Sequence, residues 1–207
     1  MKIIYGTTNK AKIHAMYGII QNYGFDAEIY TLNDIGFIDE IVEDGTTFEE
    51  NSLIKAKAIL EFCKKNNITD KIILTDDAGL CVDYLNGDPG VYTGRYAGEH
   101  ATQIDNINKL LENMKDCIKL EDRSCKLVCV LTAILLDGSV YAAKGECTGT
   151  IAFEPGKLGG LTYGPLFIPK GFDKPMGDME EEEYLSVHNH RDLAMNELMN
   201  KFKELGY

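Results

Sequence analysis

The sequence lacks several features that would assign it to particular protein classes. No apolar run approaches the roughly 18 residues that a membrane-spanning helix needs, and the first residues turn polar too soon for a signal peptide. Positive charge is also scarce, because 21 Lys and Arg face 33 Asp and Glu, for a formal net charge of −12. Phosphate contacts supply most non-specific affinity for nucleic acids. We therefore expect neither a membrane nor a nucleic-acid partner, although a local basic pocket for a small phosphorylated ligand stays open.

The cysteines lack the spacing of a metal or redox site. None of the six forms a Cys-x-x-Cys pair, and several lie inside apolar runs. We interpret them as reduced core residues of a cytoplasmic protein, in preference to metal ligands or disulfides. Internal repeats, low-complexity segments and linkers are absent as well. The 207 residues suffice for a sizeable core, and we expect a single domain, residues 1–207, with two lobes.

Hydrophobic periodicity predicts a mixed α/β fold. Short apolar runs predict strands over residues 2–5, 29–32, 71–74 and 166–168. Helical spacing predicts helices over residues 10–23, 47–64, 101–119 and 188–205, with a further helix start at the acidic run 180–183. Asp137-Gly138 joins the apolar stretch 125–136 to residues 139–147, which predicts a long antiparallel hairpin. This order favours a two-lobed α/β protein with a mixed sheet and an active-site cleft between the lobes.

Two adjacent carboxylates, Asp76 and Asp77, follow the predicted strand 71–74. Neighbouring strand residues point to opposite faces, but where a strand ends both side chains could reach one crevice, and such crevices bind ligands in α/β sheets. Two acids beside the small residues Ala78 and Gly79 suit Mg²⁺, or a metal and a base that activate water. A plain polar turn fits the same residues.

A second candidate site follows the first predicted strand. Thr7, Thr8 and Asn9 form a polar loop that leads into a helix carrying Lys12. Backbone N–H groups and the helix dipole favour an anion there, although an ordinary capped turn fits equally. Farther along, Glu43 precedes the helix 47–64, where it could ligate a metal, and Lys55 could face solvent or a polyphosphate.

Two segments near the carboxyl terminus also carry candidate residues. The glycine-dense stretch 155–165 permits close approach of backbone to a ligand, and it also fits a mobile surface loop. His188, His190 and Arg191 cluster at the start of the last predicted helix. Residues two apart on a helix do not share a face, so a cationic cluster for ligand anions or a base edge is favoured over a His-x-His metal site.

Five collinear segments together resemble the inosine/xanthosine triphosphate pyrophosphatase family. The phosphate loop of that family is similar to residues 7–12, its Glu-x-Gly-x-Thr-Phe-x-Glu-Asn motif to residues 43–51, and its Asp-Asp-Ser-Gly-Leu to residues 76–80. Its Pro-Gly-Val-x-Ser-Ala-Arg-Tyr-x-Gly resembles residues 89–99, and its carboxyl-terminal His-Arg matches His190-Arg191. The resemblance implies a two-lobed, homodimeric α/β enzyme that hydrolyses non-standard purine nucleoside triphosphates (the ITP, dITP and XTP type) to monophosphate and pyrophosphate with Mg²⁺.

The same resemblance assigns roles by position. Asp77 would be the general base, a further metal ligand or both, while Glu43 and Asp76 would hold the metal, Asp76 taking part in catalysis. The residues that would bind substrate are Thr7, Thr8, Asn9, Lys12, Lys55, Ala78, Arg95, Tyr163, His190 and Arg191. Lysines and Mg²⁺ would neutralise the triphosphate where charge develops, and a carboxylate would orient and deprotonate water.

The predicted base pocket departs from the family pattern. Leu161 stands where a purine-stacking Phe is expected, Gly164 where an Asp is expected, and Leu185 where a Lys is expected. Loss of stacking is worth about 1–3 kcal/mol in nucleic-acid systems, unless Tyr163 or Phe167 shifts to stack. We expect retained phosphate chemistry with altered base specificity; a nucleotide sensor without turnover and a hydrolase of another phosphorylated metabolite are the alternatives.

Overall fold

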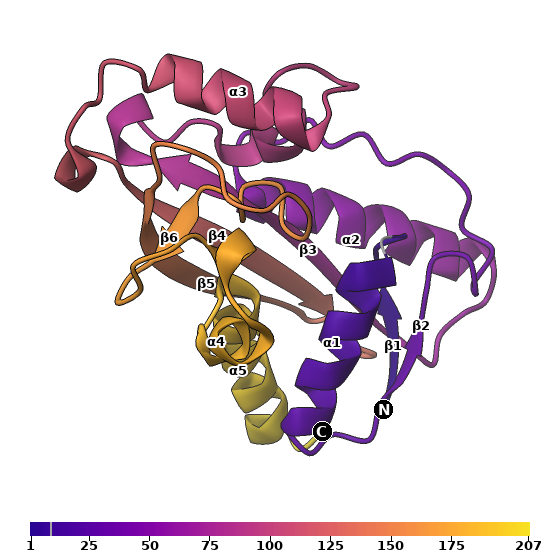
Figure 1. The fold of residues 1–207 in the computed structure, drawn as a ribbon. Coiled ribbons are helices and arrows are strands. Elements are labelled where there is room, and N and C mark those ends of the chain that lie inside the picture. The colour runs from indigo at the N-terminus through magenta and orange to yellow at the C-terminus, as the bar shows by residue number, and fades with distance from the viewer. Residues whose placement is uncertain (9) are drawn as a thin grey trace. The chain divides into compact units, whose positions relative to one another are not determined.

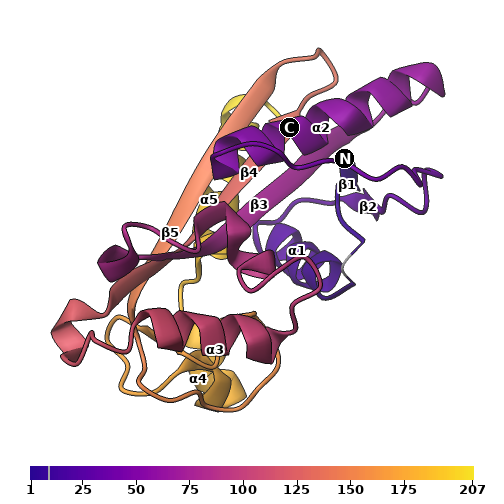
Figure 2. The same ribbon diagram turned by 90° about the horizontal axis from the view of Figure 1, so that it is seen from above.

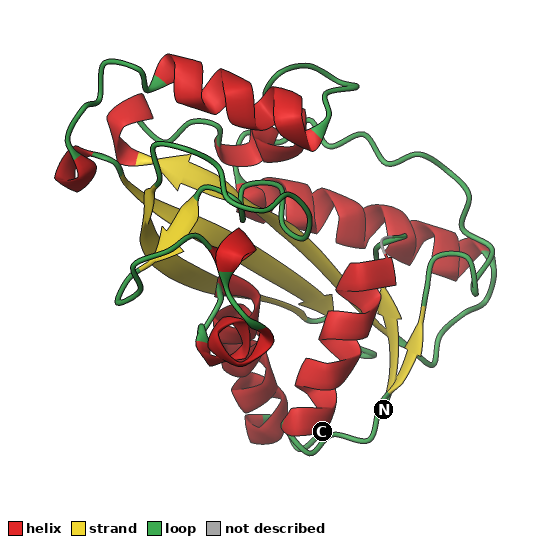
Figure 3. Cartoon of the chain, in the orientation of Figure 1, coloured by secondary structure: helices red, strands yellow, loops and turns green. Residues whose placement is uncertain are grey.

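The computed structural model describes residues 1–8 and 10–207. Strands and helices alternate along much of the chain, as the secondary-structure colours of Figure 3 show. The strands are β1 (Lys2–Tyr5), β2 (Glu28–Tyr30), β3 (Ile72–Val82), β4 (Ser124–Ile134), β5 (Val140–Ile151) and β6 (Phe167–Pro169). The α-helices are α1 (Lys10–Asn22), α2 (Phe48–Lys65), α3 (Gln103–Asn113), α4 (Glu181–Ser186) and α5 (His190–Glu204) (Figure 1).

The strands form one sheet in the order β2-β1-β3-β4-β5-β6. β1 runs parallel to both β2 and β3, with Ile4 opposite Tyr30 on one side and Ile73 on the other. β5 and β6 run antiparallel, so the sheet is mixed. The predicted mixed α/β class is confirmed.

The chain divides into two compact units. The first contains residues 1–77, 129–145 and 191–207, and the second contains residues 78–128 and 146–190. Each unit has a hydrophobic cluster of its own. Within the described residues, none of the helices is both long enough and apolar enough to cross a membrane.

The first unit is built around the packing of α2 on β1 and β3. Ala56 and Ile59 of α2 are fully buried and share a cluster with Ile4 and Ile73. Figure 1 shows α2 running alongside β3. Thr47 caps the helix: its hydroxyl accepts the Glu50 N–H, and the Glu50 carboxylate accepts the Thr47 N–H, as the capping box in the sequence predicts. The start of α2 is therefore fixed locally, which matters because the candidate site lies at this end.

The second unit packs α3 against the ends of β3, β4 and β5. Leu110, Val82 and Ile151 are buried in its cluster. Thr102 caps α3 through a capping box with Asp105. Figure 2 shows α3 along its length, seen from above.

Two element boundaries differ most from the sequence predictions. β3 does not end before the acids but continues through them to Val82, so Ala78 and Gly79 lie inside the strand and not in a turn. α3 ends at Asn113 and not near residue 119. The Arg123 guanidinium donates to the carbonyls of Met114 and Cys117, so a tertiary contact satisfies the backbone groups just beyond the helix end.

Candidate active site

Asp76 lies in the middle of β3 and is held from both sides. Its carboxylate is only 1% exposed. Tyr5 donates its hydroxyl to Oδ1 at 2.9 Å, and Lys12 Nζ lies 2.8 Å from Oδ2. The Arg191 guanidinium lies 3.5 Å from the same Oδ2. One buried carboxylate thus brings together Lys12 and Arg191, two predicted substrate-binding residues that are 179 positions apart.

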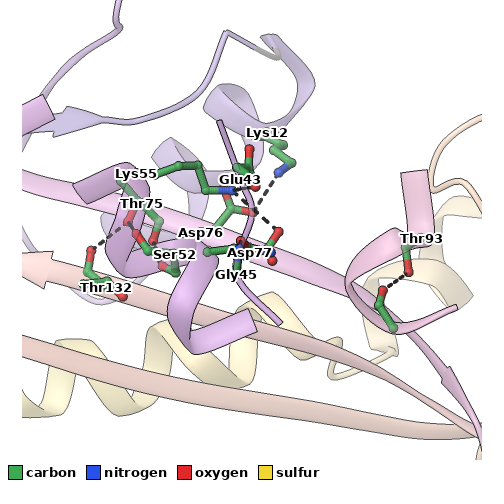
Figure 4. Close-up of polar contacts among 12 residues, drawn as sticks. Lys12, Glu43, Gly45, Ser52, Lys55, Thr75, Asp76, Asp77, Thr93 and Thr132 are labelled. Atoms are coloured by element: carbon green, nitrogen blue, oxygen red, sulfur yellow. Dashed lines mark hydrogen bonds and ion pairs between the residues drawn. The ribbon is translucent and has the colours of Figure 1, made fainter. Parts of the chain in front are cut away.

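Asp77 and Glu43 share one lysine. Lys55 Nζ lies 2.7 Å from Glu43 Oε2 and 3.6 Å from Asp77 Oδ1, and Figure 4 shows Lys55 reaching from α2 toward both acids. The Lys55 side chain is 11% exposed and that of Asp77 14%. Asp77 Oδ2 is buried without a hydrogen-bond partner in the described part of the chain. The solvent-facing alternative for Lys55 is wrong, because this side chain is a buried partner of two carboxylates.

The two neighbouring acids have opposite pKa shifts. Burial alone would raise the pKa of Asp76, but Lys12 and Arg191 more than offset it and hold that pKa well below its usual value. Burial raises the pKa of Asp77, and the attraction of Lys55 only partly opposes this, while Glu43 raises the pKa further. The environments separate an acid that stays ionised from one that takes a proton more readily, a pattern typical of acid–base sites.

Glycine and asparagine position Glu43 beside α2. A side chain at Gly45 would meet the Asn51 Oδ1 and the Glu50 Cβ at 2.7 Å, so only glycine permits this close approach. The Gly45 N–H donates to Asn51 Oδ1 at 2.8 Å, and Asn51 is itself buried. The segment before α2 is thereby fastened to its first turn, which brings Glu43 to Lys55.

Buried hydroxyls join α2 to β3 beside the acids. Thr75 donates its hydroxyl to the Ser52 carbonyl at 2.7 Å, and the two side-chain oxygens lie 3.2 Å apart (Figure 4). Both residues are fully buried. These contacts fix the position of α2 along β3. They therefore also set the distance between Lys55 on the helix and Asp77 on the strand.

Only part of the predicted phosphate loop after β1 lies within the described residues. Gly6 donates its N–H to the Leu74 carbonyl at 2.7 Å, so the loop begins against β3. Thr7 is half-buried and Thr8 exposed. The predicted phosphate ligand Asn9 lies outside the described residues.

The remaining predicted residues belong mainly to the second unit. Tyr163 is 1% exposed and lies within the hydrophobic cluster of that unit, so it is not presented as a stacking surface. Leu161 and Gly164 line a cavity of about 290 Å³. Arg95 Nε lies 3.7 Å from Glu99 Oε1. Ala78 directly follows the two acids and is half-buried. His190 is buried at the start of α5, directly before Arg191. His188 is exposed whereas His190 is buried, so the two side chains lie in different environments.

Two polar residues that shape the site have no role predicted from the sequence. Tyr5 ends an apolar strand, and Asn51 stands one turn into a helix; both are buried. The only sequence signal for each residue is a polar side chain at a position that the hydrophobic pattern predicts to face the core. Such groups need partners, and here the partners are Asp76 and the backbone of Gly45.

The acids are arranged around protein cations. Within residues 1–8 and 10–207, no three His, Cys, Asp or Glu side chains gather closely enough to hold a metal ion. The oxygen ligands that Mg²⁺ prefers are nevertheless present, and the buried, unpartnered Oδ2 of Asp77 offers one of them. Lysine ammonium groups supply the positive charge between these acids.

Comparisons with known proteins agree with the motifs. Residues 3–201 match the Ham1 family. The chain is 36% identical to the dITP/XTP pyrophosphatase of Clostridium perfringens over 202 residues, covering 98% of this chain and 97% of that protein. It is also 36% identical to the dITP/XTP pyrophosphatase of Bacillus subtilis over 195 residues, covering 94% and 93%.

Solved structures share the whole fold. The Ham1 protein of Staphylococcus aureus superimposes with a TM-score of 0.83 at 29% identity, and 99% of each chain is covered. A HAM1 protein from Coxiella burnetii gives a TM-score of 0.84 at 27% identity, again covering 99% of each chain. The resemblance predicted from five sequence segments is confirmed, and this chain belongs to the Ham1 family.

Proposed function

We propose that this chain hydrolyses non-standard purine nucleoside triphosphates, of the ITP, dITP and XTP type, to nucleoside monophosphate and pyrophosphate with the help of Mg²⁺. The similarity to proteins named dITP/XTP pyrophosphatases supports this reaction. The observation that carries the proposal is the cluster in the first unit, where Lys12, Lys55 and Arg191 pair with Asp76, Asp77 and Glu43.

The cations of this cluster suit a triphosphate. A nucleoside triphosphate carries several negative charges, and its cleavage adds negative charge to the departing pyrophosphate. Lys12 is 30% exposed at its side chain, so its ammonium group can exchange Asp76 for a phosphate oxygen. Lys55 can make the same exchange from Glu43. In this proposal Lys12 and Lys55 bind phosphates, with Thr7, Thr8 and Asn9 adding donors.

Asp77 is the residue we assign as general base. Its pKa is raised, chiefly by burial, so it accepts a proton more readily than an ordinary aspartate. Its Oδ2 is buried and has no hydrogen-bond partner among the described residues, which leaves this oxygen able to accept a proton from water. Water deprotonated at Oδ2 would attack the α-phosphate, and the bond to the pyrophosphate would break.

The acids also offer oxygen ligands to a divalent metal, although no three of them in the described part of the chain gather closely enough to hold one without rearrangement. Asp76 stays ionised, and Glu43 and Asp77 add oxygen ligands, so these three residues would hold Mg²⁺ once substrate draws the lysines to its phosphates. Bound there, Mg²⁺ would supply Lewis-acid polarisation of phosphate oxygens. Tyr5 keeps Asp76 oriented through this exchange because its hydrogen bond uses Oδ1, whereas the cations use Oδ2.

The base pocket supports an altered specificity. Leu161 and Gly164 line a cavity that has neither the expected aromatic nor the expected carboxylate at these positions, and Leu185 is 75% exposed where a lysine was expected. We therefore propose that the bond cleaved is that of the family, while the ranking of bases is particular to this chain. A hydrolase of another phosphorylated metabolite is the second candidate, and the same substitutions favour it.

One assay separates these candidates. Purified protein with Mg²⁺ is given ITP, XTP, dITP and the four standard ribonucleoside triphosphates, and released pyrophosphate and orthophosphate are measured separately, with binding measured in parallel. Pyrophosphate from at least one non-standard purine nucleotide is expected. Binding without turnover would indicate a sensor, and release of orthophosphate alone would contradict the proposed bond cleavage.

Asp77→Asn tests the base directly. The variant keeps the size of the side chain but cannot accept the proton, so we expect pyrophosphate release to fall by about 10²–10⁴-fold while the variant stays folded. Asp44→Asn is the matched control, because Asp44 is an exposed acid next to Glu43. An Asp77→Asn rate equal to that of the control would remove Asp77 from the mechanism.

Assembly and location are further parts of the proposal. We propose a single catalytic domain over residues 1–207, a homodimer and a cytoplasmic location. Within the described residues none of the six cysteines is in a disulfide and five are buried, which supports a reducing compartment. Light scattering after size exclusion tests the dimer, which requires twice the 23.1 kDa mass of one chain.

A further inference from the structure

One side chain of α3 holds the glycine-dense loop of the second unit. Gln103, the first residue of α3, accepts the Gly159 N–H with its Oε1 at 3.0 Å. Its Nε2 lies 3.2 Å from the Gly159 carbonyl oxygen, 3.0 Å from that of Leu161 and 3.2 Å from that of Thr162. The Gly159 N–H requires an acceptor and the three carbonyls require a donor, which fixes the orientation of the amide.

The loop has few other constraints of its own. Gly159 and Gly160 have φ angles of +120° and +63°, which glycine adopts without strain and which leave the unconstrained segment many alternatives. Asp178 accepts the Lys157 N–H at 2.9 Å and anchors the beginning of the loop. Between that anchor and Leu161, the contacts of Gln103 define the backbone path.

The same loop forms one wall of the cavity of about 290 Å³. Its lining includes Lys157, Leu158, Leu161, Met176 and Tyr184. Apart from the Lys157 ammonium group and the Tyr184 hydroxyl, these side chains are apolar, so a base in this cavity would also rely on backbone N–H and C=O groups of the loop. Among these, the backbone groups of Gly159, Leu161 and Thr162 are held by Gln103.

We propose that Gln103 is a positioning residue that sets base discrimination by fixing residues 159–162 in one conformation. This inference rests on the proposed function, in which the loop reads the base. Discrimination between substrates depends on fixed polar groups that the wrong substrate leaves unpaired. Without the hydrogen bonds of Gln103, a glycine-dense loop can adjust its backbone to several bases. The wrong base then no longer leaves a polar group unpaired.

The alternative is that Gln103 only stabilises the fold, and base selectivity separates the two roles. Gln103→Met keeps the length of the side chain and removes both polar atoms. Gln103→Glu keeps the acceptor for the Gly159 N–H but removes the donors to the three carbonyls. Asn108→Ala is the matched control, since Asn108 is exposed on the same helix.

The experiment measures kcat and KM for ITP, XTP, dITP and the four standard ribonucleoside triphosphates, together with amide hydrogen exchange of residues 158–162. For both Gln103 variants we expect faster exchange in this loop and about a tenfold smaller ratio of kcat/KM between the best and the standard nucleotides, the effect of one or two lost hydrogen bonds. The loss should appear in KM more than in kcat, because base contacts are made equally before and during the reaction.

The outcomes are distinct. A lower thermal midpoint with unchanged selectivity would overturn the proposal and leave Gln103 a structural residue. Faster loop exchange with unchanged selectivity would also overturn it, because the loop would then not read the base. If the unmodified protein releases no pyrophosphate from any nucleotide, the proposed function itself fails, and this inference fails with it.

Discussion

Replacing Lys55 with methionine should lower the stability of the protein and make that stability depend on Mg²⁺. Lys55 is the shared cation of Glu43 and Asp77, at 2.7 and 3.6 Å. Methionine fills a similar volume and carries no charge, so the variant leaves two carboxylates near each other without their common partner. The change tests whether this lysine takes the place of a cation that the acids would otherwise bind.

The expected loss of stability follows from the burial of each partner. Breaking a fully buried ion pair costs about 3–5 kcal/mol. Glu43 is 32% exposed, so water screens part of its charge. The pKa of Asp77 is already raised by burial, and loss of Lys55 raises it further, so proton uptake relieves part of the remaining penalty. We expect a net cost of about 2–3 kcal/mol at pH 7, which for this chain length corresponds to a thermal midpoint lower by roughly 4–12 °C.

The assay is thermal unfolding with and without 10 mM MgCl₂. A cation that binds only the folded protein stabilises it by mass action. We expect Mg²⁺ to raise the midpoint of Lys55→Met more than that of the unmodified protein, in which the ammonium group competes. The destabilisation should also be smaller at pH 5 than at pH 8, because protonation of Asp77 removes one of the repelling charges.

The matched control is Lys57→Met. Lys57 lies two residues farther along α2 and is exposed, so its loss should change the midpoint by about 1 °C or less. If Lys55→Met behaves as this control does, without a drop in stability and without a response to Mg²⁺, then Lys55 does not neutralise the acids. The reasoning that connects lysine exchange to metal binding would then be wrong.

Two further predictions concern Asp76. Tyr5→Phe removes the hydroxyl bonded to Oδ1 and leaves a buried acceptor unpaired, so chemical denaturation at pH 7 should show a loss of about 1–3 kcal/mol; a loss below 0.5 kcal/mol would contradict a structural role for this hydrogen bond. Burial raises the pKa of Asp76, but Lys12 and Arg191 lower it by more, so the folded-state pKa lies below that of the unfolded chain. The carboxylate therefore stabilises the fold above about pH 4, and that contribution is lost as the pH falls through the folded-state pKa. The difference in unfolding free energy between the unmodified protein and Asp76→Asn should thus stay constant between pH 5 and 7 and shrink below pH 4, and a difference that grows on acidification would refute the assignment.

Local sequence signals predicted the helix starts well. The capping boxes at Thr47 and Thr102 use residues three positions apart, so the information that begins each helix lies within one turn. Periodicity likewise located β1 over the same residues that the structure shows. The end of α3 could not be predicted in this way, because Arg123, nine residues beyond Met114, satisfies the carbonyls there.

The sequence predicts which residues belong to the site better than it predicts how those residues are arranged in space. Asp76 and Asp77 were expected at the end of a strand, where the pleat breaks, yet they lie within β3. Alanine and glycine are compatible with either structure, so only pairing with neighbouring strands decides between them. Tyr5 and Lys12 approach Asp76 from two elements near the amino terminus, and Arg191 approaches it from α5. These contacts depend on packing between residues that are far apart in the sequence.

The placement of both acids within one strand has a chemical consequence. Neighbouring residues on a regular strand sit in different environments, and here Asp76 contacts Tyr5, Lys12 and Arg191 whereas Asp77 contacts Lys55. The first environment supplies donors to both carboxylate oxygens and keeps the acid ionised, while the second leaves one buried oxygen unpartnered in the described part of the chain. A single strand therefore presents an acid whose pKa is lowered beside one whose pKa is raised. Acids at a flexible turn could not keep these separate roles, because each would exchange between the two environments.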